Sequence, residues 1–303
     1  MIGVIILNYL TYNETINCVK SILKYKKNNI KIYIVDNASP NNSFEILKDY
    51  FCNFSNIYLV KNEKNEGYAV GNNLAIISAV KECQYIIISN SDVIFTKNSI
   101  DELIRPISEN KANCVAPMVL KDDDSEWLSN QFVPVGKKEL ILGYSFLKRL
   151  DLKKTYKSVS GLDKDRKSSS YIYAPSGCCF SIDSKDFKRI GFFDENTFLG
   201  YEEAILGKKL QNNNLKVLYN PKAKIYHMHM ASTKQIGGLS MVYCTQSEIY
   251  YAKRYLNSGK LFLNFLFLIR VIEYFRLIIK DNNNFKWLFK YIGNYKYIYT
   301  KGK

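Results

Sequence analysis

Residues 2–7 read Ile-Gly-Val-Ile-Ile-Leu, and this apolar run stops at Asn8-Tyr9 before a segment with helical spacing at 13–23. A short apolar run bounded by polar residues is typical of a buried strand. It has neither the basic leader nor the small-residue cleavage site of a signal peptide, so we interpret it as a first strand. A strand followed by a helix is the repeating unit of an α/β fold.

The same alternation continues to residue 92. We expect strands at 30–35, 57–60 and 85–89, with helices at about 43–51 and 71–81 between them. Strands that alternate with helices imply a mainly parallel central sheet flanked by helices. Ligands bind such sheets beyond the carboxyl ends of the strands. Polar residues gather at those ends, namely Asn8, Asp36, residues 65–73 and Asp92.

The composition is that of a folded chain with a basic end. The 303 residues are 47% hydrophobic and 14% aromatic, which excludes general disorder, and the net charge is +15. In residues 251–303, eleven Lys or Arg stand against Glu273 and Asp281, an excess of +9. Such a tail suits an anionic surface, either phospholipid or nucleic acid. Seven cysteines without a CxxC pair favour a reducing compartment.

Two later segments have distinct compositions. Residues 151–170 are rich in Lys, Ser and Asp, and we interpret them as a mobile loop that orders over a substrate, or as a variable surface insertion. Residues 261–280 are hydrophobic, but their charges argue against a membrane-spanning helix. Charged residues recur there every three or four positions, at Arg270, Glu273, Arg276 and Lys280. This helix would lie in a membrane interface or pack on the protein, and the Lys and Tyr that follow favour the membrane.

Each acidic or glycine-rich strand end has a chemical and a structural interpretation. Asp36 can accept the imide N–H of uracil or thymine, or a ribose hydroxyl, or it can stabilise its own turn. The segment 65–73 places Gly67 and Gly71 before a helix, where backbone N–H groups favour an anion, although a simple loop and cap would use the same residues.

The remaining candidates are a metal pair and a carboxylate pair. Asp92 offers the oxygen that Mg²⁺ or Mn²⁺ prefers, and His227, one of two histidines, can supply a second ligand or be structural. Glu202 and Glu203 begin an expected helix at 202–210, where the helix dipole alone would favour them. Aromatic residues precede the pair, and we expect burial to raise the pKa of a carboxyl there toward that of a general base.

On these motifs the chain resembles the inverting family 2 glycosyltransferases of GT-A fold, most closely their bacterial rhamnosyltransferase-like branch. The resemblance covers about residues 2–230 and rests on the order and spacing of segments 6–9, 35–39, 65–73, 90–93, 191–195 and 201–203. It implies a nucleotide-sugar-binding and catalytic domain at 1–230, with the mobile loop at 151–170 inside it. Residues 231–303 would form a helical, basic extension.

The resemblance also implies a role for each matching residue. Asp36 would help bind the base, with Asn8 and Tyr9 beside the nucleotide, and Asp92 and His227 would hold Mg²⁺ or Mn²⁺. Glu203 would be the catalytic base, supported by Glu202. The other nucleotide-sugar-binding positions would be Asn65, Gly67, Tyr68, Gly71, Asn72, Asn90 and Ser91. The chain departs from the family pattern at Asn90, Glu203, Ile205 and Lys209.

The expected reaction moves a sugar from a dTDP- or UDP-sugar, with dTDP-rhamnose as the first guess, to a glycan or lipid-linked glycan. The reaction would belong to the synthesis of a capsule or lipopolysaccharide at the inner face of the cytoplasmic membrane. The sequence is compatible with an oligomeric protein. A sugar nucleotidyltransferase is disfavoured because residues 8–12 are not a glycine-rich basic loop. A nucleic-acid-binding protein would leave Asp36, Asp92 and Glu203 unexplained, so no nucleic acid is expected. A dehydrogenase is disfavoured because no GxGxxG follows a strand.

Overall fold

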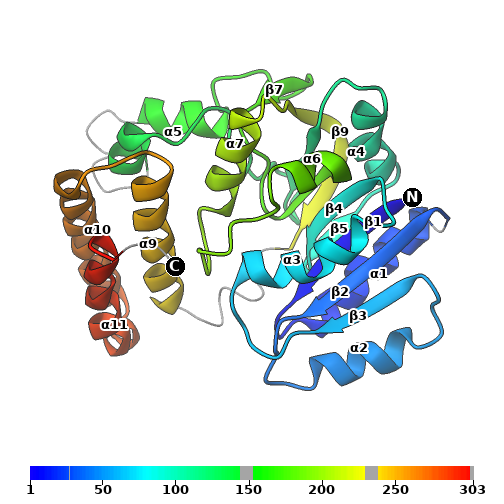
Figure 1. The fold of residues 1–303 in the computed structure, drawn as a ribbon, viewed down its shortest axis with the longest axis horizontal. Helices are drawn as coiled ribbons and strands as arrows, with labels where there is room; N and C mark the ends of the chain where they lie inside the picture. The colour runs from blue at the N-terminus through cyan, green and yellow to red at the C-terminus, as the bar shows by residue number, and fades with distance from the viewer. Residues whose placement is uncertain (27, 144–152, 229–237, 301–303) are drawn as a thin grey trace.

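The N-terminal half of the sheet is parallel, as expected. The structure is a computed structural model, and it describes residues 1–26, 28–143, 153–228 and 238–300. Four strands lie in the order β3-β2-β1-β4: β1 (Ile2–Asn8), β2 (Ile30–Asp36), β3 (Ile57–Lys61) and β4 (Tyr85–Asn90). All pair in parallel, so their carboxyl ends share one edge of the sheet (Figure 1). The helices between them are α1 (Tyr12–Tyr25), α2 (Ser43–Phe51) and α3 (Tyr68–Ala79).

The sheet becomes mixed beyond β4. Its order continues through β8 (Cys179–Asp183), β6 (Cys114–Leu120), β9 (Val217–His227) and β5 (Val93–Phe95), while β7 (Ser170–Ile172) pairs with β9. Among these, β6 and β9 are parallel, and β8 runs antiparallel to both β4 and β6. The expectation of a mainly parallel sheet therefore describes the first half, and later strands add antiparallel pairs.

Helices cover both faces of the sheet, which explains why a central strand such as β1 is apolar on both sides. On one face the core is built with α1, α2 and α4 (Ser99–Ser108), and on the other with α3, α6 (Ser184–Arg189) and α7 (Glu202–Asn212). β1 has six buried residues out of seven. This two-layer covering leaves the strand ends as the place where polar groups can gather.

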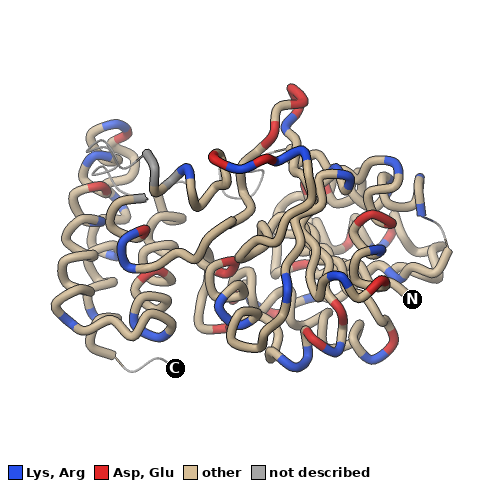
Figure 2. Tube along the Cα trace, turned by 90° about the horizontal axis from the view of Figure 1, so that it is seen from above, with Lys and Arg blue, Asp and Glu red and all other residues tan. Residues whose placement is uncertain are grey.

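The C-terminal helices pack on this α/β body. They are α9 (Gly238–Arg254), α10 (Lys260–Lys280), η3 (Asn282–Trp287), α11 (Leu288–Ile292) and η4 (Gly293–Ile298). Ala204 and Ile205 of α7 share a hydrophobic cluster with Ile249 and Leu266 of the extension. In Figure 1, α10 and α11 lie outermost, and Figure 2 shows Lys and Arg along these helices. Within the described ranges, no helix has the length and apolar character needed to cross a membrane.

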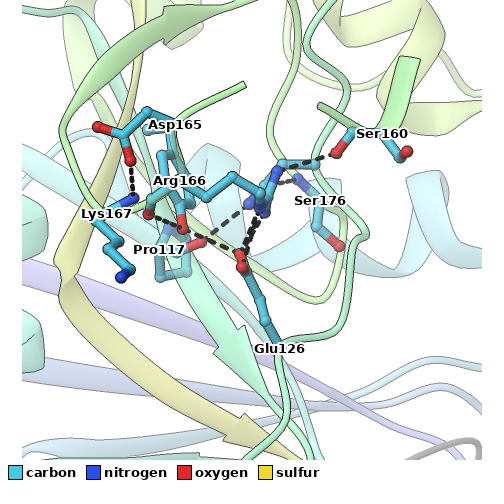
Figure 3. A network of polar contacts seen from close by, with 9 residues as sticks. Pro117, Glu126, Ser160, Asp165, Arg166, Lys167 and Ser176 are labelled. Atoms are coloured by element: carbon cyan, nitrogen blue, oxygen red, sulfur yellow. Dashed lines mark hydrogen bonds and ion pairs between the residues drawn. The ribbon is translucent and has the colours of Figure 1, made fainter. Parts of the chain in front are cut away.

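Within the loop expected over 151–170, the described residues include a helix and a turn with polar contacts, and the mobility of the loop stays a prediction. The helix is α5 (Lys153–Ser160), and the turn is held by Arg166, whose Nε lies 2.9 Å from both carboxylate oxygens of Glu126 (Figure 3). The guanidinium also donates to the carbonyl of Ser160 at 2.9 Å and lies 4.7 and 4.9 Å from the ring centres of Phe132 and Tyr219. The charged composition did not indicate that one of its cations has specific partners elsewhere in the fold, and the expected movement over a substrate stays a prediction. Residues 151 and 152 lie outside the described part.

Candidate active site

The ends of β1 and β2 place Asn8 beside Asp36. These residues are register partners, and Asn8 Nδ2 donates to Asp36 Oδ1 at 2.6 Å. Asp36 also accepts from the Ser39 hydroxyl at 2.7 Å and from the Ser39 backbone N–H at 3.1 Å. The carboxylate is 2% exposed, so it stabilises its own turn in this structure. Recognition of a base by Asp36 stays a prediction.

A helix begins within the glycine-rich segment 65–73, and Gly67 and Gly71 both have structural roles there. Helix α3 begins at Tyr68, three residues before the expected position, and Gly67 caps it with φ +98°. The N–H of Gly71 bonds to the Gly67 carbonyl at 3.1 Å inside the helix, and the expected role of Gly71 in donor binding stays a prediction. A Cβ at Gly71 would lie 2.6 Å from Leu7 Cδ1. Gly71 therefore lets α3 approach the end of β1 closely.

Two asparagines of this segment are buried, and Asn73 anchors the segment to the rest of the protein. Asn73 Nδ2 donates to the Phe193 carbonyl at 3.1 Å, and its Oδ1 accepts from the Phe193 N–H at 3.2 Å. This joins segment 65–73 to the Gly-Phe-Phe-Asp turn at 191–194. Asn72 is fully buried and donates to the Tyr68 carbonyl at 2.9 Å, while its Oδ1 has no hydrogen-bond partner in the described part of the chain. Its expected contact with the donor is untested.

The pairing of strands β5 and β9 brings Asp92 and His227 together. β4 ends at Asn90 and β5 begins at Val93, whose antiparallel register partner is His227 at the end of β9. Asp92 Oδ1 therefore lies 3.0 Å from His227 Nε2, and both side chains are under 10% exposed. Asn90 Nδ2 lies 3.4 Å from the same nitrogen. The ring of Trp127 stacks on the imidazole at 4.7 Å, a contact that we did not expect from the sequence.

This pair fits half of a divalent-metal site. Among the residues that the structure describes, no three or more His, Cys, Asp or Glu side chains gather as metal ligands. One carboxylate oxygen and one imidazole nitrogen are still a donor set that Mn²⁺ accepts, with phosphate oxygens and water in the other positions. Ser91, between the strands, bonds instead to the Thr11 hydroxyl at 2.8 Å.

Glu202 and Glu203 begin α7 after Tyr201, which has φ +68°. Glu203 Oε1 accepts from the Gly177 N–H at 3.1 Å, and the Gly177 carbonyl accepts from the Tyr68 hydroxyl at 2.6 Å. Glu202 Oε1 accepts from the Gly200 N–H at 2.7 Å. Burial, together with the charge of Glu203, raises the pKa of Glu202 to about 8. The expected rise in carboxyl pKa thus occurs at Glu202.

Residues 177 and 178 are hydrogen-bonded to both the strand end at 90–92 and the start of α7. The Gly177 N–H donates to Glu203, and the carbonyl of Cys178 accepts from the Asn90 N–H at 2.8 Å. Burial raises the pKa of the Cys178 thiol to about 12. Because adjacent residues bond to Asn90 and to Glu203, the strand end at 90–92 and the start of α7 lie close together.

A cavity of about 180 Å³ lies next to Tyr68, whose hydroxyl donates to the Gly177 carbonyl. Four of the expected nucleotide-sugar residues line it, namely Tyr9, Asn65, Gly67 and Tyr68. Leu239 and Tyr243 of α9 also line it, and Tyr243 stacks on Phe198 with ring centres 4.1 Å apart. The sequence did not predict that Leu239 and Tyr243 line the cavity, because α9 is distant in sequence from the cavity's other residues.

Two departures from the family pattern have structural roles. Ile205 is 1% exposed in the core shared with the C-terminal helices. Lys209 Nζ donates to the carbonyls of Phe192 at 2.6 Å and Gly191 at 3.2 Å. Lys209 therefore holds the 191–194 turn, in which Phe192 has φ +56°.

This architecture defines the class of fold, which is the GT-A fold of glycosyltransferases. The chain is similar to GalNAc-T7, solved with UDP, GalNAc and Mn²⁺, with a TM-score of 0.61 and 18% identity over 84% of this chain and 50% of that one. It is also similar to the mannosyltransferase PcManGT of Pyrobaculum calidifontis, solved with GDP-Man and Mn²⁺, with a TM-score of 0.59 and 12% identity over 97% and 73%. At these identities the likeness shows the fold.

The family follows from the sequence comparison. The profile of Glycosyl transferase family 2 matches residues 3–190, and the chain belongs to this family. Glycosyltransferase GlyG of Streptococcus pneumoniae serotype 4 is 31% identical over 126 residues, which are 42% of this chain and 41% of GlyG. The N-acetylglucosaminyl-diphospho-decaprenol L-rhamnosyltransferase of Mycobacterium tuberculosis is 24% identical over 217 residues, 67% of this chain and 68% of that protein. The match to GlyG thus spans about two fifths of the relative.

Proposed function

We propose that this protein is an inverting, metal-dependent glycosyltransferase that moves a sugar from a dTDP- or UDP-sugar to a hydroxyl of a glycan or lipid-linked glycan. One observation carries the proposal: the strand end that holds the Asp92–His227 pair is joined to Glu203 through residues 177 and 178, by the bonds from the Gly177 N–H to Glu203 and from the Asn90 N–H to the Cys178 carbonyl. The mycobacterial relative is named as a rhamnosyltransferase, which supports dTDP-rhamnose as the first donor to test.

The cavity beside the strand ends is the proposed donor site. Tyr9 and Tyr68 supply aromatic walls, and Asn65 supplies an amide. Solved proteins of similar fold carry UDP or GDP-mannose, which supports a nucleoside diphosphate sugar here. Asp36 and Asn8, which are bonded to each other at the adjacent strand ends, would orient the base and ribose.

Asp92 and His227 would hold Mg²⁺ or Mn²⁺ next to this donor site. The bound ion supplies Lewis-acid chemistry, offsetting negative charge on the departing diphosphate. This chain's own contribution is to fix the two donor atoms 3.0 Å apart. Trp127 holds the plane of the imidazole by stacking on it.

Glu203 would act as the catalytic base. As the acceptor oxygen forms its bond to C1, the bond from C1 to the diphosphate oxygen breaks, and the acceptor proton passes to Glu203. A single displacement from the opposite face inverts the anomeric centre. The Gly177 N–H positions the Glu203 carboxylate at 3.1 Å. Glu202, whose pKa is raised to about 8 by burial and by Glu203, keeps its proton at neutral pH and does not compete as a base.

We propose that this reaction belongs to bacterial surface polysaccharide synthesis, such as that of capsule or lipopolysaccharide. We place the enzyme in the cytoplasm, at the inner face of the cytoplasmic membrane, where lipid-linked glycans are presented. The basic C-terminal residues support this setting.

The test is sugar transfer from a panel of dTDP- and UDP-sugars with Mg²⁺ or Mn²⁺. We expect Glu203→Gln to lower transfer by about 10²–10⁴-fold while donor binding persists, and Asp92→Asn to weaken the response to metal. Gly177→Ala should lower transfer with little loss of stability, because its Cβ would lie 2.8 Å from Glu203 Oε1, the end of a flexible side chain. Gly259→Ala, where a Cβ meets nothing within 4 Å, is the control.

Two results would overturn these roles. If none of the dTDP- or UDP-sugars binds, the proposed donor class is wrong. If Glu203→Gln transfers sugar as fast as the unmodified protein, another group is the base.

A further inference from the structure

The outer face of α10 carries a continuous line of exposed apolar side chains. Six of them are between 40% and 86% exposed: Leu261, Phe265, Leu268, Ile272, Phe275 and Ile279. With about 100° of rotation per residue, these positions fall within an arc of about 80° on one side of the helix. We call these six residues the outer stripe. Exposed apolar surface of this extent marks an interaction site more often than a plain surface.

The opposite face of α10 is fixed to the protein, so the outer stripe cannot turn inward. Arg270, about 180° from the stripe, is 5% exposed. Its Nε donates to Glu248 Oε2 at 2.7 Å, and its Nη2 donates to the Leu140 carbonyl at 2.8 Å. Leu263 and Leu266 are buried on the same side. The helix is thus apolar on two faces, and the protein covers one of them.

The apolar surface extends beyond α10. A groove of about 690 Å³ runs between α10 and residues 292–296, and Leu268 of the outer stripe lines it together with Ile292. Ile292 is 43% exposed, and Phe289, one helical turn earlier, is 83% exposed. The outer stripe and the exposed side chains of α11 therefore form one broad apolar surface.

Cations border this surface on both sides. On α10, Lys260 lies about 100° to one side of the stripe, and Arg276 and Lys280 lie about 60° and 100° to the other. All three are exposed, and so are Lys286 and Lys296 on the following segments. An apolar face rimmed by Lys and Arg is the pattern of a helix that lies in the plane of an anionic membrane surface. A second copy of this chain would bring like charges together, so charge complementarity favours lipid over self-association.

We propose that the outer stripe, with the Lys and Arg beside it, binds the surface of an anionic phospholipid bilayer, with α10 parallel to the membrane plane. The inference rests on the proposed function in one respect, which is that the proposed reaction takes place at a membrane. Docking would also orient the active site, because Tyr201, next to Glu202, donates to Glu248, the partner of Arg270, and α9 lines the donor cavity.

Vesicle flotation of the full-length protein tests the proposal. The vesicles are phosphatidylcholine alone, or an equal mixture of phosphatidylcholine and phosphatidylglycerol, at low and high salt. The key variant is Leu268→Ser/Ile272→Ser, and the matched control is Leu74→Ser/Ile77→Ser, a pair of exposed apolar residues on α3. Sugar transfer to a soluble acceptor is measured on the same samples.

The unmodified protein and the α3 control should float with anionic vesicles only, less so at high salt, and the α10 variant should partition about tenfold or more weakly. Equal flotation of the α10 variant, or no flotation of the unmodified protein, would overturn the proposal. So would a dimer in sedimentation that the α10 variant abolishes, since the stripe would then be a self-association surface. A protein that floats but transfers no sugar would contradict the proposed function alone.

Discussion

Glu202 and Glu203 are neighbours in the sequence but face different surroundings. Glu202 is 8% exposed and accepts from the Gly200 N–H, whereas Glu203 is partly exposed and accepts from Gly177 on the far side of the site. A helix turns by about 100° per residue, so two adjacent side chains cannot share one environment. This geometry gives the two carboxyls different roles in the proposed mechanism, Glu203 as the base and Glu202 as a carboxyl with a raised pKa.

The pH dependence of stability should report Glu202. Its pKa rises from 4.5 to about 8 on folding, because of burial and the charge of Glu203, so its contribution to stability is complete below about pH 4.5 and is lost as pH rises through 8. Glu202→Gln keeps an acceptor for the Gly200 N–H without a charge. We expect a flatter profile, and above pH 8 a gain on the order of 1 kcal/mol, or about 2–4 °C in Tm.

Thermal melts of both proteins from pH 5 to 9 provide the measurement, with exposed Glu45→Gln as the control. Melting curves that keep a constant separation across this range would show that Glu202 titrates as an ordinary exposed carboxyl.

At this scale, the sequence predicted which residues meet but not how each is used. Asp92 and His227 are in contact as expected, because each ends or follows a strand and the register pairs Val93 with His227. Trp127 could not be found, since nothing local connects it to a histidine a hundred residues later. Gly71 was assigned to an anion because its close contact with Leu7 depends on how a helix packs on a strand.

At the scale of elements, a buried ion pair connects three helices to the active site. Arg270 of α10 binds both carboxylate oxygens of Glu248 on α9, and the Tyr201 hydroxyl at the start of α7 donates to the same carboxylate. Arg270 and Glu248 are 6% and 2% exposed. Because Tyr201 has φ +68°, unfavourable for a bulky residue, this contact helps hold the backbone that presents Glu202 and Glu203.

Replacing Arg270 alone should lower the stability of the fold more than replacing both Arg270 and Glu248. Arg270→Met leaves the Glu248 carboxylate buried without its cation, which should cost about 3–5 kcal/mol of unfolding free energy. Arg270→Met/Glu248→Met should recover much of that loss. Urea unfolding measures both, with exposed Lys280→Met as the control. If the double variant is less stable than Arg270→Met, the pair is not the source of the cost.

The sequence predicted elements well where an element's own residues determine it. The first four strands are apolar runs with polar ends, and each was expected within two residues of its observed bounds. Residues 151–170 were interpreted as a mobile loop because the partners that order Arg166, Glu126 and Tyr219, are distant in sequence. The helix expected at 261–280 formed at 260–280, and the choice between membrane and protein was not exclusive, because one face packs and the other is exposed.

At the scale of the whole molecule, the C-terminal helices and the α/β body depend on each other. α9 connects the two parts. Its residues Leu239 and Tyr243 line the cavity proposed for the donor, while Ile249 and Ala252 share a core with Leu266 of α10. Family resemblance reaches about residue 230, yet the cavity is completed beyond that point. Sequence patterns could not show this, because packing between distant segments leaves no local periodicity.

Deletion of residues 257–303 should therefore impair the enzyme as well as any membrane binding. The deletion uncovers the buried side of α9 and leaves the Glu248 carboxylate without Arg270, so α9 should loosen and the wall containing Tyr243 should be lost. We expect weaker donor binding and faster cleavage of residues 238–254 in limited proteolysis. Leu268→Ser/Ile272→Ser, which changes only exposed positions, should keep both properties. A shortened protein that binds donor normally and resists protease would show that the α/β body completes its donor site without α10, and vesicle binding by the outer stripe would then be a separable property.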